Sequence, residues 1–421
     1  EQVQQDLIKE SQLIEKDFLP LKLGYESDYS FPTRTILSVQ KNINWKHRID
    51  PFGLVNIPFT YDKRRNLTYN KMCFDIKWGK NGETQAVLKN YIDCLMIIMR
   101  NKVVLNDCDL KRTDITWFYP ISMEDGRKSF LEKYWNNAYE KYFRGKRKEE
   151  ESIIESEEDT FEKDGNISSV TESTAPVKAF YAIHNDAIKI ASIDIGGGTT
   201  DVAISENKKE LSYVTSFRFA TNDLFDVSYS RINVCSGIID YFKHSFKEIL
   251  GRNDKLKELF DVFSDDDNKN PVNMASFLFS LKHNSMIKKN DVNIDSIDFF
   301  SILQKDEYFK IVFLLYYSAI IFHLARIMKV ANKGKTNEDM FVPRYLTFSG
   351  NGSRIIGTLT PDIKGVLTDY TKILIQKVIG QACSNLEICG INDGSSPKKA
   401  TCIGGLVTNT DIDDRDKNVI L

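Results

Sequence analysis

Two alternating apolar segments, Ala187–Ile195 and Thr199–Ser205, flank three consecutive glycines at positions 196 to 198. Alternation of apolar and polar side chains is typical of half-buried strands. A tight bend between strands favours residues that accept positive φ, and glycine accepts it without steric cost. Glycines also remove side chains from the bend, so several backbone N–H groups can face one bound anion. This unit therefore predicts two strands joined by an anion-binding turn.

Acidic and hydroxyl side chains flank this turn. Asp194 ends the first strand, and Asp201 follows a pair of hydroxyls from Thr199 and Thr200. Bare carboxylates would repel phosphate, so carboxylates beside a phosphate loop indicate a divalent cation between the two. An ordinary two-residue hairpin needs neither Asp194 nor the Thr-Thr-Asp sequence. The pattern favours a phosphate site with a divalent cation over a plain hairpin.

A second glycine turn follows another strand much later in the chain. Tyr345–Phe348 has the composition of a buried strand, and Ser349–Ser353, with the sequence Ser-Gly-Asn-Gly-Ser, follows it directly. Two such turns indicate separate contacts to one elongated ligand. The first turn does not match the dinucleotide fingerprint Gly-x-Gly-x-x-Gly. Gly334-Lys335-Thr336 lacks the first glycine of a Walker loop and follows a helix, so it is interpreted as a helix-ending loop.

Apolar residues at helical or alternating spacing predict the other elements of the chain. The expected helices are 1–17, 83–100, 127–143, 171–183, 224 onward, 232–263, 277–289, 301–331 and 367–380, and the other expected strands are 31–39, 72–78, 115–120 and 211–219.

Composition limits the function classes. The 421 residues carry a formal net charge of -2, and the lack of a basic excess argues against nucleic acid as the main partner. The seven cysteines form no Cys-x-x-Cys pair, which favours reduced thiols in a cytoplasmic protein over disulfides or a zinc site. The longest apolar run, Ile311–Phe322, is shorter than the ~18 residues of a membrane span. We therefore expect a buried helix there and no membrane span.

Residues 149–164 are dense in Glu, Asp and Ser. High charge and few aromatic residues favour an exposed insertion, which we expect to occupy 146–170. An acidic docking site, or a partner for the basic run Arg144–Lys148, is the alternative.

The two glycine turns resemble motifs of the ATPase superfamily of actin, DnaK-type chaperones and sugar kinases. Residues 194–204, Asp-Ile-Gly-Gly-Gly-Thr-Thr-Asp-Val-Ala-Ile, are similar to its second phosphate motif, and residues 346–355 resemble its adenosine motif. Four further segments resemble other parts of the same superfamily in the same order: 31–39 its early strand, 115–120 the strand before the first connecting helix, 172–179 that helix, and 397–407 the closing segment.

The resemblance implies an α/β actin-like ATPase fold. Its two lobes would each be built on a ribonuclease H-like mixed sheet with helices, plus smaller inserted subdomains. The expected boundaries are a first lobe at 1–185, with a smaller subdomain at 31–112 and a core part at 113–185, a second lobe at 186–407, with core parts at 186–222 and 340–407 and a smaller subdomain at 223–339, and a tail at 408–421.

The resemblance also implies roles for individual residues. Asp194 would orient the metal and its waters, and Glu172 would position or deprotonate the attacking water. A carboxylate that favours a helix start is the alternative for Glu172, and pairing with a carboxylate is the alternative to base stacking for Arg354. The expected nucleotide contacts are Gly196, Gly197, Gly198, Thr199 and Thr200 to phosphate, Ser349, Gly350, Asn351, Gly352, Ser353 and Arg354 to adenosine, and Lys282 with His283 to the other side of the base. Asp201 is also expected in the nucleotide site, and a structural partner of the turn is its alternative role.

One family motif is missing from the beginning of the chain. The first phosphate hairpin, Asp-x-Gly-Thr, should precede Phe31, but residues 1–30 offer only Lys22-Leu23-Gly24-Tyr25. Because the chain begins at Glu1, we expect the hairpin to lie upstream in a longer parent chain. The alternative is a degenerate family member.

The resemblance implies a Mg²⁺-dependent ATPase domain that binds ATP or ADP and acts as a conformational switch within a larger protein. Its hydrolase activity would convert ATP to ADP and phosphate. Further domains of the parent chain, or a protein partner, would respond to the switch. A nucleotide-binding scaffold without turnover and a small-molecule kinase are the alternatives.

Overall fold

The computed structural model describes residues 35–40, 54–56, 70–73, 82–145, 165–207, 213–225, 241–242, 248, 251, 254, 298–390, 397–407 and 418–419. The described residues fall into two compact units. The first comprises Arg34–Trp117 and Met123–Ser169, and the second comprises Phe118–Ser122 and the chain from Val170 onward. These units are not the predicted lobes, 1–185 and 186–407, and the division into lobes stays a prediction. The expected helices at 1–17 and 277–289 and the acidic stretch 149–164 lie outside the described residues, and the expected helix at 232–263 is described only at 241–242, 248, 251 and 254.

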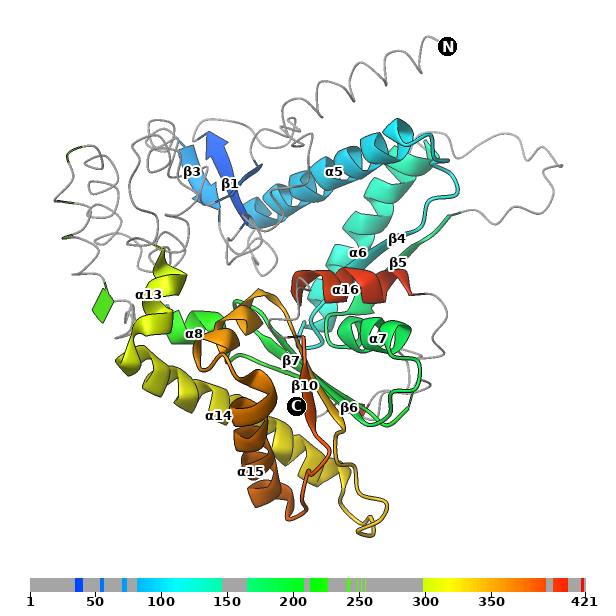
Figure 1. Cartoon of the computed structure of the whole chain (residues 1–421). Helices are drawn as coiled ribbons and strands as arrows, with labels where there is room; N and C mark the ends of the chain where they lie inside the picture. The colour runs from blue at the N-terminus through cyan, green and yellow to red at the C-terminus, as the bar shows by residue number, and fades with distance from the viewer. Residues whose placement is uncertain are drawn as a thin grey trace. The chain divides into compact units, whose positions relative to one another are not determined.

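The first unit contains a helical pair and a small antiparallel sheet (Figure 1). The helix predicted at 83–100 is confirmed as part of the longer helix α5 (Gly82–Leu105), along which Leu88, Ile92 and Met96 form a buried stripe. Trp117 stacks on Trp135 with ring centroids 6.1 Å apart. The elements are β1 (Thr35–Gln40), β2 (Leu54–Asn56) and β3 (Asn70–Cys73) in the order β2-β1-β3, then α5 (Gly82–Leu105), α6 (Asp125–Tyr139) and the π-helical turn η3 (Glu140–Arg144).

A strand that the sequence analysis did not predict precedes the helix expected at 171–183. β4 (Ile115–Tyr119) pairs with β5 (Ile167–Thr171), and α7 (Thr174–Ile183) follows. Bonds from Ile115 N to Asn166 O and from Glu172 N to Tyr119 O show that residue numbers rise together, as in a parallel pair. The expected helix start at Thr171 was therefore wrong, because β5 ends there. A five-residue strand is too short for alternation to separate it from a helix start.

The second unit is built on one mixed six-stranded sheet in the order β10-β9-β6-β7-β8-β11 (Figure 1). β6, β7 and β8 form the predicted antiparallel meander, and β9, β10 and β11 each run parallel to their neighbour. The α/β class and the mixed sheet are confirmed. The strands are β6 (Ile190–Ile195), β7 (Thr200–Ser205), β8 (Tyr213–Phe217), β9 (Tyr345–Ser349), β10 (Glu387–Cys389) and β11 (Asn418–Val419).

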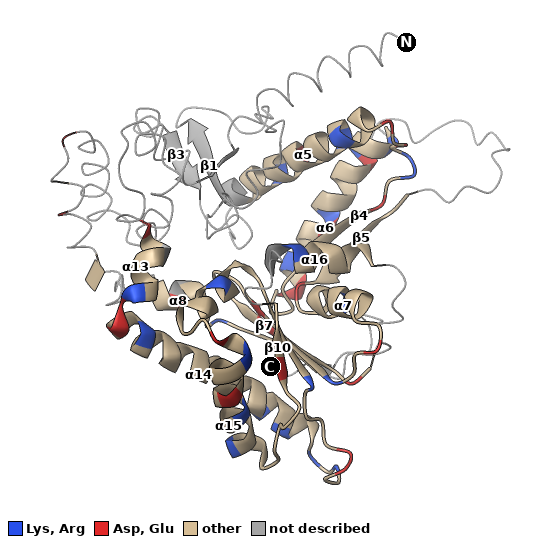
Figure 2. Cartoon of the chain, in the orientation of Figure 1, with Lys and Arg blue, Asp and Glu red and all other residues tan. Residues whose placement is uncertain are grey.

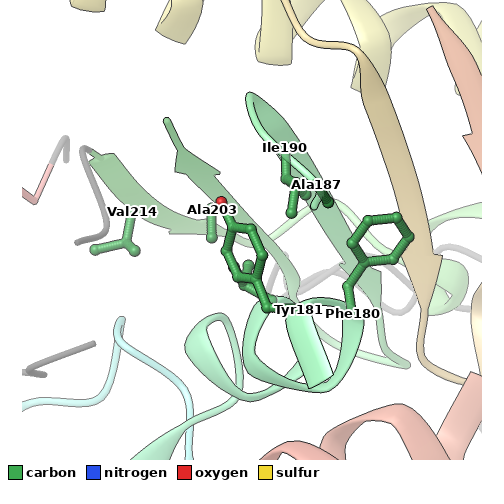
Figure 3. Packing of buried hydrophobic residues seen from close by; sticks show 7 residues of the cluster. Phe180, Tyr181, Ala187, Ile190, Ala203 and Val214 are labelled. Carbon is green, nitrogen blue, oxygen red and sulfur yellow. The ribbon is translucent and has the colours of Figure 1, made fainter. Parts of the chain in front are cut away.

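Helix α7 covers one face of this sheet. Phe180 and Tyr181 point from the helix towards Ala203 and Val214 on the strands (Figure 3). The Tyr181 hydroxyl also lies 2.9 Å from the Ser205 Oγ. Side chains alternate between faces along a strand. The positions in register with Ala203 and Val214 therefore share the α7 face.

Helix α14 (Glu307–Ala331) covers the other face, and α15 (Thr368–Ile379) packs against α14. The Tyr317 hydroxyl lies 2.7 Å from the Thr371 Oγ1, which ties the two helices together. Aromatic contacts join α14 to the sheet and its loops; they are Tyr317 with Phe348, Tyr316 with Phe219, and His323 with Phe217. The predicted helix at 367–380 is confirmed as α15, which a π-helical turn, η9 (Ile363–Leu367), precedes.

The expected single helix over 301–331 is wrong, because the chain breaks at Asp306. Asp306 has an extended backbone with ψ 116°, and its side chain accepts a hydrogen bond from Phe309 N at 2.7 Å. That bond caps α14 and separates it from α13 (Phe299–Lys305). Apolar periodicity on both sides of Asp306 concealed the break.

Within the described residues, α14 is the one helix long and apolar enough to cross a membrane. Half of that apolar stretch is buried inside the protein, as in the core helix of a globular domain. Figure 2 shows charged residues along α14 and α15, whereas the strands of the sheet are largely free of them. This single helix is weak evidence for a membrane span.

Candidate functional site

Asp194 lies at the end of β6 in the middle of the six-stranded sheet. In the strand register it stands beside Ser349 of β9 on one side and Asp201 of β7 on the other. The sheet therefore brings polar residues from both predicted motifs to the same level. The distance in sequence between the two motifs is bridged by parallel pairing of β6 with β9.

The loop after β6 has a fixed backbone orientation. Gly196 N donates to Thr199 O at 2.9 Å, and Gly196 O accepts both Thr221 N at 3.2 Å and Thr221 Oγ1 at 2.8 Å. In a trans peptide the N–H points away from the preceding C=O, so the Gly197 N–H faces away from Thr221. Within the described part of the chain, no hydrogen bond uses the N–H of Gly197, Gly198 or Thr199. These donors can serve a bound anion.

The glycines of this loop do not need a left-handed backbone. None of Gly196, Gly197 and Gly198 has positive φ, so that part of the prediction is wrong. A Cβ on Gly196 would stand 3.0 Å from the Thr199 carbonyl oxygen, which is close but not prohibitive. The absence of side chains leaves the backbone N–H groups accessible to an anion. The sequence analysis gave this as a reason for glycine besides positive φ.

The turn after β9 packs directly on this region. Gly350 has φ +78°, and a Cβ on it would overlap Ile195 O and come within 2.5 Å of Asp194 Oδ1. A Cβ on Gly352 would overlap Thr221 Oγ1 and would stand 2.8 Å from Ile195 O. The second glycine turn therefore lies against the end of β6 and the segment that holds the first loop.

Two hydroxyls bind the carboxylate of Asp194. Ser349 Oγ donates to Asp194 Oδ2 at 2.8 Å, and Thr401 Oγ1 donates to the same oxygen at 3.3 Å. Thr401 belongs to α16 (Pro397–Leu406), which also packs on α7. The sequence prediction missed Thr401, since nothing local distinguishes it from other residues of the closing segment. It also missed Thr221, which binds Gly196 O and begins α8 (Thr221–Phe225).

The side chains of Thr200 and Asp201 are buried in the sheet. Thr200 Oγ1 donates to Phe219 O at 2.7 Å and so joins β7 to the segment before α8. Asp201 is 2% exposed. Both residues therefore contribute to the structure beneath the loop, and direct contact with phosphate stays a prediction.

The segment after Gly350 forms a 3₁₀-helix, η8 (Asn351–Thr358). Ser353 closes the turn, because its N–H and its hydroxyl both donate to Gly350 O, at 3.2 Å and 2.7 Å. Asn351 Oδ1 and Arg354 Nε are buried and show no hydrogen bond to any described residue. Burial lowers the pKa of the Arg354 guanidinium. The predicted alternative of a carboxylate partner for Arg354 finds no ion pair among the described residues.

Glu172 lies between β5 and α7 and is partly buried. Its N–H donates to Tyr119 O at 2.9 Å. A second hydrogen bond spans Glu172, because Thr174 N donates to Thr171 Oγ1 at 3.2 Å. The side chain therefore belongs to a fixed strand–helix junction. Its catalytic role stays a prediction. Lys282 and His283 lie outside the described residues.

Among the described residues, no group of three or more His, Cys, Asp or Glu side chains could hold a metal ion. Mg²⁺ does not require such a group, because it keeps several waters and binds proteins through one or two carboxylates plus substrate phosphates. One oriented carboxylate, Asp194, beside open backbone donors fits a metal that arrives with phosphate. The donor set does not fit a metal held by protein ligands alone.

The described architecture defines an α/β protein with a mixed sheet and a polar site where β6 and β9 end. No protein-family model and no curated protein sequence match this chain. Among solved structures, the ethanolamine utilization protein EutJ from Carboxydothermus hydrogenoformans is 11% identical, covering 95% of this chain and 97% of that chain, with a TM-score of 0.33. A similarity this low carries no argument about function, which has to come from the site itself.

Proposed function

We propose that this chain is an actin-like or DnaK-like ATPase domain that binds Mg²⁺ and ATP where β6 and β9 end. The main support is the meeting of two glycine turns beside one carboxylate. Gly350 lies against both Asp194 and Ile195, although the two turns are far apart in the sequence. A long anionic ligand could place its phosphate groups against the backbone donors of the first turn. Its other end could then lie against η8 in the second turn.

In this proposal each group has a separate task. The N–H groups of Gly197, Gly198 and Thr199 bind phosphate oxygens, and Asp194 holds the hydrated metal that neutralises phosphate charge. Glu172 positions the attacking water. Asn351 and Arg354 supply the buried polar groups nearest the adenosine. Hydrolysis changes the closure of two lobes and so signals to other domains or to a protein partner.

The proposal is tested by titrating the purified chain with ATP and ADP, with and without Mg²⁺, by calorimetry. We expect saturable binding that Mg²⁺ strengthens. Asp194→Asn should remove most of the Mg²⁺-dependent part of the affinity. Asp186→Asn, which changes an exposed acid outside the site, is the matched control. Equal Mg²⁺-dependent binding by the Asp194→Asn variant and the unchanged chain would overturn the site assignment.

A nucleotide-binding scaffold without turnover is the second candidate. It is favoured by one observation, Asn351, which interrupts the glycine pair of the second turn. The two functions differ in the fate of bound ATP. Quenching the complex after long incubation and separating ATP from ADP distinguishes them, because a scaffold returns ATP and an ATPase domain returns ADP with phosphate.

A further inference from the structure

A hydroxyl from outside the sheet helps to orient Asp194. Ser349 is its neighbour in the strand register, whereas Thr401 reaches the same Oδ2 from α16 at 3.3 Å. Two hydroxyl donors on one oxygen restrain rotation of the carboxylate. The other oxygen, Oδ1, then faces the turn at Gly350, 2.5 Å from where a Cβ would stand. The position of α16 therefore influences how Asp194 presents its carboxylate.

The same helix is held against the beginning of α7. Gly404 follows Thr401 by three residues, so the two lie on one face of α16. A Cβ on Gly404 would overlap the backbone of Ala175, at its carbonyl oxygen, carbon and Cα. Ala175 lies in the first turn of α7, three residues after Glu172. One face of α16 thus contacts the carboxylate of Asp194 and the helix that Glu172 precedes.

We propose that Thr401 is a positioning residue for the metal–nucleotide site, and that close packing at Gly404 sets its distance from Asp194. This role rests on the proposed function, because it concerns the metal that arrives with the nucleotide. A hydroxyl that orients a metal-binding carboxylate is worth about ten- to hundredfold in metal affinity. Thr401 would therefore affect the Mg²⁺-dependent part of nucleotide binding and leave the Mg²⁺-free part unchanged.

The direct test compares Thr401→Val with Thr401→Ser. Valine keeps the branched shape of threonine without the hydroxyl, and serine keeps the hydroxyl. We expect Thr401→Val to weaken ATP binding in Mg²⁺ about ten- to hundredfold, with no change when Mg²⁺ is chelated. Thr401→Ser should retain binding close to that of the unchanged chain. A loss that serine does not rescue, or a loss that is equal with and without Mg²⁺, would overturn the role.

A second pair of variants tests the packing half of the proposal. Gly404→Ala places a methyl group against the Ala175 backbone and should push α16 away from Asp194. It should reproduce the Mg²⁺-specific loss of Thr401→Val without touching the hydroxyl. Gly405→Ala, one residue further along the same helix, is the matched control and should bind normally. Normal Mg²⁺-dependent binding by Gly404→Ala would overturn the proposed part of Gly404.

The outcomes separate the two levels of the argument. No Mg²⁺-dependent nucleotide binding by the unchanged chain would overturn the proposed function and this role with it. Binding by the unchanged chain that Thr401→Val leaves intact would overturn this role alone. Thermal unfolding of each variant shows whether it is folded. Should Thr401→Val fail to fold, Thr401→Ala replaces it, because alanine fits a partly exposed helix position without steric conflict.

Discussion

The two glycine turns look alike in sequence but do different physical work. In the loop after β6 the glycines have no positive φ, and the N–H groups of Gly197 and Gly198 are open. In the turn after β9, Gly350 has φ +78° and has no space for a Cβ. The first set of glycines is therefore suited to a ligand, whereas the second is required by packing. The comparison shows that a glycine motif alone does not reveal which of these two requirements applies.

The largest effect should come from Gly350→Ala. The variant would need a left-handed backbone and would place its methyl group against Ile195 O and Asp194 Oδ1. The left-handed conformation alone costs about 1–2 kcal/mol, and overpacking costs about 1–3 kcal/mol more. Denaturant unfolding followed by tryptophan fluorescence should show a decrease in the free energy of unfolding near the upper end of these two costs combined. A stability equal to that of the unchanged chain would show that the turn after β9 tolerates side chains, and the contrast would collapse.

Thr221→Val should have the next largest effect, because Thr221 Oγ1 holds the first loop through Gly196 O. Loss of a buried hydrogen bond of this kind costs about 1–3 kcal/mol. The Thr221 N–H still donates to Gly196 O, so we expect the lower part of that range. Thr221→Ser keeps the hydroxyl and should remain close to the unchanged chain. Destabilisation by Thr221→Ser without destabilisation by Thr221→Val would mean that the Thr221 methyl group, not the hydrogen bond, supports the loop.

The sequence predicted the local parts of the site and missed its long-range parts. Alternation around the glycines located β6 and β7, the apolar pattern at 211–219 located β8, and the composition of 345–348 located β9. Those signals lie within a few residues of the element that they predict. The bond from Thr401 to Asp194 depends on how α16 packs against a strand far away in the chain. Periodicity and motif spacing contain no information on such a contact.

Two further misses concern local features of the backbone. Asp306 is a capping residue, but apolar residues continue on both sides, so the pattern resembled one long helix. Positive φ was expected in the triple glycine because tight turns use it often, whereas Gly350 is the residue that has it. Helical periodicity was correct on both sides of Asp306 but not at Asp306 itself. Positive φ was correct for a glycine turn, but it occurs in the second turn and not in the first. Only the packing around each residue distinguishes the cases.

Gly197→Ala should separate binding from stability on the other side of the comparison. Gly197 is exposed and does not have positive φ, so alanine should change the free energy of unfolding by less than about 1 kcal/mol. A methyl group in front of the open donors should nevertheless weaken nucleotide binding by about tenfold, or about 1.4 kcal/mol. Calorimetry measures the affinity and denaturant unfolding measures the stability. Unchanged affinity would show that the first loop does not face the ligand.

The smallest effect is expected from Thr347→Val, which tests how far the polar site extends into the sheet. Thr347 lies two residues before Ser349 on the same face of β9, in register with Ser192 of β6. The side-chain oxygens of Thr347 and Ser192 are buried and show no hydrogen bond to any described residue. Replacing a buried, unpaired hydroxyl with a methyl group should be neutral or stabilising by about 1 kcal/mol. Thermal unfolding of Thr347→Val and of Ser192→Ala would detect this.

A clear loss of stability in Thr347→Val would mean that an ordered water binds these hydroxyls, because a group with a partner is costly to remove. The hydrogen-bonded polar region around Asp194 and Ser349 would then include the pair Thr347 and Ser192, one step deeper in the sheet.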